Sequence, residues 1–144
     1  MFSLLKREFP DGKKPIFLLV EDGKCPILEF EEEIQKEGNY EMQIDKIRTS
    51  MYGRSCGARL SEDKFKDLKP RPKGDNVKDY EYKTHMLRVY SFEYEGGEVI
   101  WGGEKKDPKK QSRTIARMRE AKARFYVQVN SSEGIKIKGE NENV

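Results

Sequence analysis

Residues 86–110 read MLRVYSFEYEGGEVIWGGEKKDPKK, and this stretch decides the fold of the chain. Apolar and polar side chains alternate along its first part, as a half-buried strand requires, with Arg88 near the centre. Gly96-Gly97 reverses the chain, and a second short strand leads directly into Lys105 and Lys106 ahead of a basic helix. We expect this hairpin to hold Arg88 on one face with the two lysines beside it. A cationic group of this kind suits polyanions, above all RNA.

The length of the chain fits a single domain. Its 144 residues can bury a core without disulfides or metal ions, although 38 % are charged and only 35 % are hydrophobic. We expect one domain over 1–144, with its core at about 15–125, a polar N-terminal lead-in at 1–14 and a weakly structured tail at 126–144.

Charge is distributed unevenly along the chain. The net charge is only +3. From Glu21 to Asp45, however, nine side chains are acidic and two are basic, whereas from Lys105 to Arg124 nine are basic and two are acidic. A basic segment of this size predicts binding to nucleic acid, although charged helix faces are also common in proteins that bind none.

Cysteine, histidine and hydropathy patterns narrow the possible functions. Cys25 and Cys56 lack the spacing of a zinc site or a disulfide framework, and His85 is the single histidine, so we expect no metal and no cofactor. The N-terminus lacks the apolar core of a signal peptide, and no apolar run reaches the length of a membrane span. These features predict a cytoplasmic protein with no membrane partner.

Hydrophobic periodicity predicts the other elements, which are a buried strand at 16–20, helices at 26–36 and 40–52, strands from Tyr80 to Trp101 and a helix from Pro108 to about Arg124. The first two helices form a helical hairpin laid against the sheet. Residues 53–79 show no clear pattern. This order of elements is an α+β layout and not a βαβ alternation.

Arg88 lies in a predicted strand, where a charged residue needs a reason. One interpretation pairs it with Glu81 or Glu93 on an exposed face of the sheet. The other interpretation places its guanidinium, fixed on a rigid strand, against two phosphate oxygens. The spacing alone leaves both interpretations open.

Lysines gather where the second strand gives way to the basic helix. Lys105, Lys106, Lys109 and Lys110 flank a proline at this transition, and backbone N–H groups in the first turn of a helix also face an anion. A solvated run of charge is the alternative. The candidates for contact with an RNA backbone are Lys109, Lys110, Arg113 and Arg117.

Lys83, His85 and Tyr90 complete the candidate residues. In one unbroken strand, Lys83 and His85 would face away from Arg88, whereas a turn at Thr84-His85 would lift this restriction. His85 could then act as a general base near neutral pH, or be a surface residue. Tyr90 is either a ring that stacks on RNA bases or a half-buried sheet residue.

The hairpin and its flanks resemble a known family. The stretches that carry the resemblance are YKTHMLRVYSF at 82–92, GGEVI at 96–100, EKKDPKK at 104–110 and CPILEF at 25–30. Over about residues 15–125 the chain resembles the RelE/HigB superfamily of toxins from type II toxin–antitoxin systems, in its HigB-like branch. The resemblance implies an α+β fold with a twisted antiparallel sheet, an N-terminal helical hairpin packed on it and a basic C-terminal helix.

The resemblance also implies an activity, that of a ribosome-dependent mRNA endoribonuclease that needs no metal. A ribose 2′-hydroxyl attacks the adjacent phosphate, and cationic side chains stabilise the developing charge. By position, Arg88 would hold the scissile phosphate, and the other catalytic candidates are Lys105, Lys106, Lys83 and His85. The implied partners are mRNA on the ribosome and a cognate antitoxin of the helix-turn-helix type.

The chain also departs from the family pattern. Asp107-Pro108 follows the lysine pair, near the point where many relatives carry Tyr or His, and residues 55–79 and the tail are additions. Two alternatives therefore stay open. One is a non-catalytic relative from a phage or mobile element that binds nucleic acid or a protein, and the other is an interaction domain that uses the acidic helices at 27–45.

Overall fold

The computed structural model describes residues 1–142 as one mixed sheet with three α-helices. The strands are β1 (Phe2–Arg7), β2 (Ile16–Glu21), β3 (Phe65–Asp67), β4 (Asp79–Lys83), β5 (Leu87–Tyr94), β6 (Gly97–Lys105) and β7 (Ile137–Gly139). The helices are α1 (Pro26–Glu37), α2 (Glu41–Ser55) and α3 (Gln111–Val129), and a short 3-10 helix, η1 (Glu140–Glu142), follows β7. The predicted α+β class is confirmed.

The order of the strands across the sheet is β3-β4-β5-β6-β2-β1-β7. β2 runs parallel to β6 and β1 runs parallel to β7, whereas all the other neighbours are antiparallel. The expectation of an antiparallel sheet is therefore wrong. The reason is the connection after β2, in which α1 and α2 carry the chain to the far side of the sheet, so that β6 returns beside β2 in the same direction.

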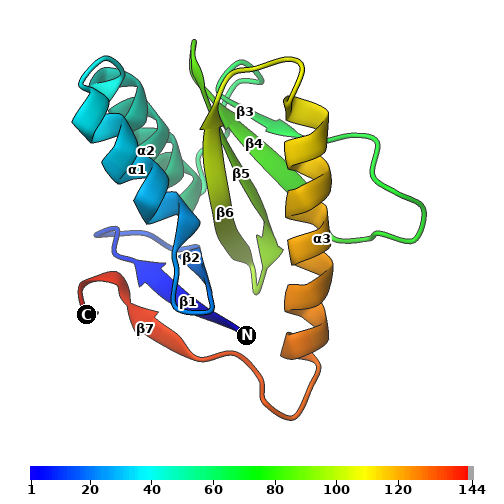
Figure 1. Cartoon of the computed structure of the whole chain (residues 1–144). Helices are drawn as coiled ribbons and strands as arrows, with labels where there is room; N and C mark the ends of the chain where they lie inside the picture. The colour runs from blue at the N-terminus through cyan, green and yellow to red at the C-terminus, as the bar shows by residue number, and fades with distance from the viewer. Residues whose placement is uncertain (143–144) are drawn as a thin grey trace.

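Helices cover both faces of the sheet, as Figure 1 shows, with α1 and α2 on one face and α3 on the other. One apolar core lies under α1 and α2, around Ile34, Ile47 and Val89. A second core lies under α3, around Phe92 and Phe125. The predicted helical pair exists, but two strands precede it, because the polar lead-in also folds.

The predicted hairpin of β5 and β6 forms, but its turn lies at Glu95-Gly96, one residue before the predicted Gly96-Gly97. Glu95 and Gly96 both have positive φ, at 51° and 76°, which is the backbone of a two-residue turn that matches the twist of the strands. Farther along β6, a Cβ placed on Gly103 would lie 2.6 Å from the ring of Phe30 in α1. Glycine at this position therefore lets α1 approach the sheet closely.

Both ends of the described chain are more ordered than predicted. The lead-in at 1–14 contains β1, whose Phe2 and Leu4 are buried because they alternate inward beside β2. In the predicted tail, α3 continues to Val129 and β7 then pairs with β1; residues 143–144 lie outside the described part. Among the helices of residues 1–142, none is both long and apolar enough to cross a membrane.

Three tyrosines with raised pKa values make the free energy of unfolding depend on pH in the alkaline range. Burial disfavours the charged phenolate and raises the pKa of Tyr80 and of Tyr126 to about 12 in each case. Burial also raises the pKa of Tyr82 well above its ordinary value. We expect these groups to leave the free energy of unfolding unchanged up to about pH 10, where unfolded tyrosines ionise, and to lower it as the pH rises towards 12. Denaturant unfolding at several pH values, with phenolate absorbance as a second signal, tests this. Unfolding free energy that stays constant over this range would contradict it.

Candidate nucleic-acid interface

The basic segment from 105 to 124 divides into paired and unpaired cations. Four of its nine basic side chains form ion pairs with carboxylates elsewhere in the fold. These pairs are Lys105 with Glu37, Arg119 with Asp79, Lys122 with Asp75 and Asp79, and Arg124 with Glu21. Four of the nine positive charges in this segment are therefore paired with carboxylates of the same chain.

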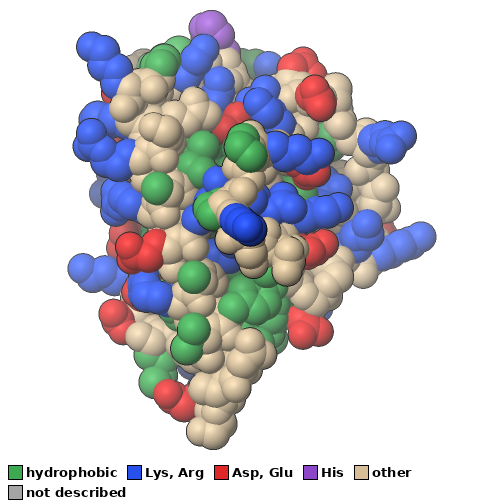
Figure 2. Space-filling model, turned by 90° about the vertical axis from the view of Figure 1, so that its right-hand side faces the viewer, with side chains coloured by type: hydrophobic (Ala, Val, Ile, Leu, Met, Phe, Trp, Pro, Cys, Tyr) green, Lys and Arg blue, Asp and Glu red, His purple; other side chains and the backbone are tan. Residues whose placement is uncertain are grey.

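The other five cations form what we call the α3 surface, which comprises Lys106, Lys109, Lys110, Arg113 and Arg117. All five are exposed, and none forms an ion pair with any residue in 1–141, the part of the chain whose side chains are described. Spacings of three and four residues place those on the helix and its first turn on one side, away from the buried Met118 and Phe125. Figure 2 shows Lys and Arg side chains spread over the side of the molecule that includes α3.

The backbone amides at the start of α3 are less available than the sequence predicts. Asp107 accepts the N–H of Lys109 on its side chain, at 3.0 Å, and the N–H groups of Lys110 and Gln111 on its carbonyl. An anion at this end of the helix would therefore meet cationic side chains rather than these three amides.

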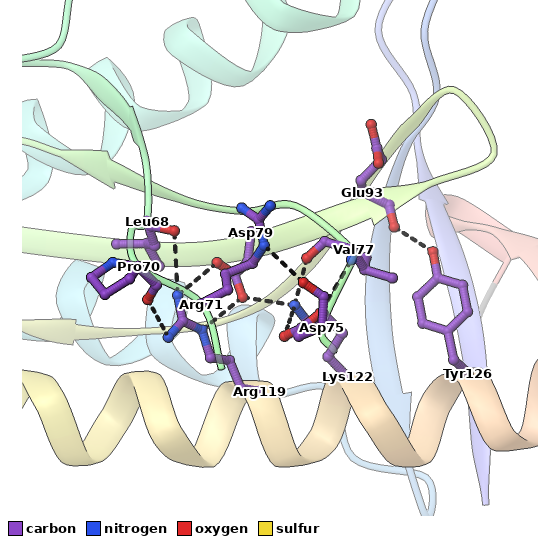
Figure 3. Close-up of polar contacts among 10 residues, drawn as sticks. All are labelled: Leu68, Pro70, Arg71, Asp75, Val77, Asp79, Glu93, Arg119, Lys122 and Tyr126. Carbon is purple, nitrogen blue, oxygen red and sulfur yellow. Dashed lines mark hydrogen bonds and ion pairs between the residues drawn. The ribbon is translucent and has the colours of Figure 1, made fainter. Parts of the chain in front are cut away.

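A buried ion network fixes α3 in place, as Figure 3 shows. Asp79 of β4 is fully buried and accepts hydrogen bonds from Arg119 Nε at 2.9 Å and from Lys122 Nζ at 2.8 Å. Lys122 also bonds to Asp75 and to the carbonyl of Val77. The network joins the middle of α3 to the sheet and to the 68–79 segment, so it holds the α3 surface outward on a rigid support.

The Arg88 side chain contacts the turn between β4 and β5 and a carboxylate of β4. Its Nη1 donates to the carbonyls of Thr84, at 2.6 Å, and Leu87, at 2.9 Å, and its Nε lies 3.8 Å from Glu81 Oε1. The Arg88 side chain is only 12 % exposed, and it lies on the face of the sheet that α3 covers. Of the two interpretations of Arg88, the structure therefore contains the pairing with Glu81, but on a face that α3 covers and not on an exposed face as predicted.

Lys105 lies on the opposite face from Arg88. Glu104 is the ladder partner of Arg88, and it accepts a hydrogen bond from Thr114 of α3, whereas the next residue, Lys105, contacts Glu37 of α1. Adjacent residues in a strand point to opposite faces, so the sheet itself separates the two cations. The expected grouping of Arg88 with Lys105 is wrong. Lys106 lies just beyond β6, where its N–H bonds to the Met86 carbonyl.

Lys83 is the last residue of β4, and His85 lies in the turn between β4 and β5. β4 ends at Lys83 and β5 begins at Leu87, and Lys83 pairs directly with Arg88 in the ladder. The turn that would lift the restriction on facing is therefore present. Lys83 and exposed His85 also line a hollow of about 590 Å³ that they share with residues of α2.

Tyr90 is not available to stack on a base. Its ring is fully buried under α3, and its hydroxyl donates to Glu104 Oε2 at 2.8 Å. Burial and this carboxylate raise the pKa of Tyr90 well above the usual range. The alternative of a buried sheet residue is therefore the one that the structure contains.

Comparisons of the chain with protein-family models, with curated proteins and with solved structures give no match.

The carboxylates inside the sheet are the residues that sequence reasoning missed. Glu98 and Asp79 are both buried in strands, each beside a cation from another element, whereas Glu81 was already a candidate partner of Arg88. Their signal in the sequence is weak, since Asp79 lies on the face of β4 opposite Tyr80 and Tyr82 and is buried because α3 covers that face. Counting charges by segment hides this signal because it does not show which charges meet in space.

Removing Asp79 should loosen α3 specifically. In Asp79→Asn, Arg119 and Lys122 lose their shared carboxylate in a buried place, and we expect the free energy of unfolding to fall by about 3 kcal/mol. Glu32→Gln is the matched control, because Glu32 pairs with Lys36 on an exposed helix face and should cost no more than about 0.5 kcal/mol. Denaturant unfolding measures both. Equal losses in the two variants would contradict the importance of the network.

A structural role for Arg88 predicts coupling to Glu81. In Arg88→Met, Glu81 stays buried with only Gln111 as a hydrogen-bond donor, and we expect a loss of about 1–3 kcal/mol in the free energy of unfolding. In Glu81→Gln combined with Arg88→Met, part of that loss should be recovered, because no buried charge remains unpaired. The double-mutant cycle, measured by denaturant unfolding, tests this; strictly additive losses would argue against the pairing.

Proposed function

We propose that this protein binds RNA through the α3 surface and does so without cutting it. The observation that supports the proposal is the set of five exposed cations, Lys106, Lys109, Lys110, Arg113 and Arg117, that have no carboxylate partner among residues 1–141. Cations that the fold leaves unpaired on one rigid side are suited to the regularly spaced charges of a phosphate backbone. Charged side chains that served only to keep the protein in solution would not need to lie on one side of the molecule.

Electrostatics set the expected strength and salt dependence of this binding. If each of the five cations neutralises one phosphate of a single strand, the slope of log affinity against log salt concentration is about −3.5. A slope of this size predicts clear binding at low salt and much weaker binding at physiological salt. The α3 surface consists of cations and includes no exposed aromatic ring that could stack on a base, so we expect little preference for RNA sequence.

Catalysis is not part of this proposal because the candidate catalytic groups are dispersed. Arg88 and Lys105 lie on opposite faces of the sheet, and α3 covers the face that carries Arg88. A phosphodiester would reach Arg88 only if its guanidinium left the carbonyls of Thr84 and Leu87. A binding protein with the same fold needs no such rearrangement.

A ribosome-dependent mRNA endoribonuclease is the second candidate function. The order β2, α1, α2, β3, β4, β5, β6, with both helices on one face, supports a RelE/HigB-like fold. The ladder pairing of Lys83 with Arg88 also favours it, because it places the backbone positions of two candidate catalytic cations opposite each other on neighbouring strands. In that case mRNA on the ribosome would be the substrate, in the cytoplasm, and acidic segments of a helix-turn-helix antitoxin would cover the α3 surface.

The double variant Arg113→Gln/Arg117→Gln tests RNA binding. We expect its affinity for a labelled single-stranded RNA to fall about tenfold at low salt, and the salt slope to become shallower by about 1.4, because two phosphate contacts are lost. Fluorescence anisotropy over a series of salt concentrations measures both quantities.

Arg124→Gln is the matched control, since Arg124 lies on the same helix but pairs with Glu21. An RNA affinity that does not change with salt concentration, or an equal loss of affinity in the control, would refute the proposal.

Mapping of transcript ends after induced expression in a bacterium separates the two candidate functions. Ribosome-dependent cleavage that disappears in Arg88→Ala would replace simple binding with the endoribonuclease.

A further inference from the structure

A second polar cluster lies at the end of α2, away from the α3 surface. Arg54, in the last turn of α2, lays its guanidinium over the edge of the sheet, 4.2 Å from the ring centroid of Phe65 and 5.4 Å from that of Tyr80. Two aromatic faces therefore restrict the plane of the guanidinium. The side chain is 24 % exposed, so part of it is accessible to solvent.

A buried carboxylate fixes Arg54 from below. Glu98 of β6 is only 3 % exposed, and its Oε1 accepts hydrogen bonds from the hydroxyls of Tyr82, at 2.8 Å, and Ser91, at 2.9 Å. Its Oε2 accepts the Nε–H of Arg54 at 2.9 Å. A buried ion pair of this kind adds little net stability, because desolvation of both charges offsets their attraction. What it does supply is a guanidinium held in one position.

The hydrogen bond of Arg54 to Glu98 uses Nε, and among residues 1–141 neither terminal nitrogen of Arg54 donates a hydrogen bond to a carboxylate. Arg54 borders two hollows, one of about 550 Å³ between the 57–62 loop and β3, and one of about 310 Å³ beside the turn at Gly96. Exposed cations line these hollows, namely Lys14, Arg59, Lys66, Lys69 and Lys78. Three carboxylates other than Glu98 also line them, so the local balance stays positive.

We propose that Arg54 is the anchor of a site for a phosphate monoester. An arginine fork matches two phosphate oxygens, and a fork that is already fixed loses little entropy on binding. The surrounding lysines supply the remaining charge for a dianion. The monoester can come from a free nucleotide or from the 5′ end of an RNA, since both present the same group. This site goes beyond RNA binding by the α3 surface and does not depend on it.

Titration of the wild-type protein with inorganic phosphate and with adenosine 5′-monophosphate, followed by NMR at constant ionic strength, tests the site. We expect saturable shifts in the Arg54 Nε–H and in the amides of Lys66 and Gly97, with the Arg113 amide unaffected. Adenosine without phosphate should cause no such shifts. Shifts that spread evenly over all exposed lysines and arginines would overturn the proposal.

Two variants make the test specific. Lys66→Gln/Lys69→Gln changes only exposed side chains at the rim, and Arg54→Lys keeps the charge beside Glu98 but removes the fork; each should weaken phosphate binding about tenfold. Lys46→Gln, on the same helix as Arg54 but outside both hollows, is the control and should leave it unchanged. Phosphate binding that survives both site variants would refute the assignment.

The source of the phosphate is resolved with two RNAs of one sequence, one with a 5′-phosphate and one with a 5′-hydroxyl. Tighter binding of the phosphorylated RNA, lost in Arg54→Lys but kept in Arg113→Gln/Arg117→Gln, identifies an RNA end as the ligand. Equal binding of the two RNAs, together with saturable binding of the nucleotide, identifies a free nucleotide. Failure of RNA binding alone would leave the phosphate titration intact, so the two proposals fail separately.

Discussion

The contact of Asp79 with Arg119 and Lys122 is the constraint on which the arrangement of this molecule depends. The apolar side of α3 is narrow, with Met118, Ala121 and Phe125 as its fully buried apolar residues. A strip of this width can slide or rotate on a sheet, whereas a buried carboxylate that binds two cations one turn apart admits one position of the helix. The rotation of α3 then decides which of its cations face the solvent and which side of the sheet stays covered.

The same device recurs at other points in the fold. Glu31 and Glu98 are buried carboxylates that each bind an arginine from a different element, Arg7 in the first case and Arg54 in the second. A chain with more charged than hydrophobic residues cannot cover both faces of a seven-stranded sheet with apolar side chains alone. It therefore joins its layers partly through ion pairs whose geometry is specific, because an unpaired buried charge would be costly. Specific geometry of this kind also leaves defined cations free at the surface.

Sequence reasoning reached the local features and missed the long-range ones. The β5–β6 hairpin and the pair α1 and α2 could be predicted because alternation, turn residues and helix-terminating glycines act over a few positions. β1 could not, since its alternation is weak and becomes meaningful only when β2 and β7 lie on either side. For Arg88 the alternation gave the correct parity, but nothing in the hairpin reveals that α3 covers that face. The sequence predicts only the whole basic segment from 105 to 124. It does not show which four cations of that segment pair with carboxylates and which five remain to form the α3 surface.

The pairing of β1 with β7 has a consequence for the order of folding. Arg7 is enclosed by Glu31 and by Glu140, which is 133 residues away along the chain. During synthesis, β1 and β2 can pair early, but Arg7 must wait for the segment that carries Glu140 before its second carboxylate arrives. A newly made chain thus passes through a stage in which one sheet edge is open and Arg7 has only one of its two carboxylate partners. Chaperones that recognise open strand edges would meet the protein at this stage, before the last strand closes that edge.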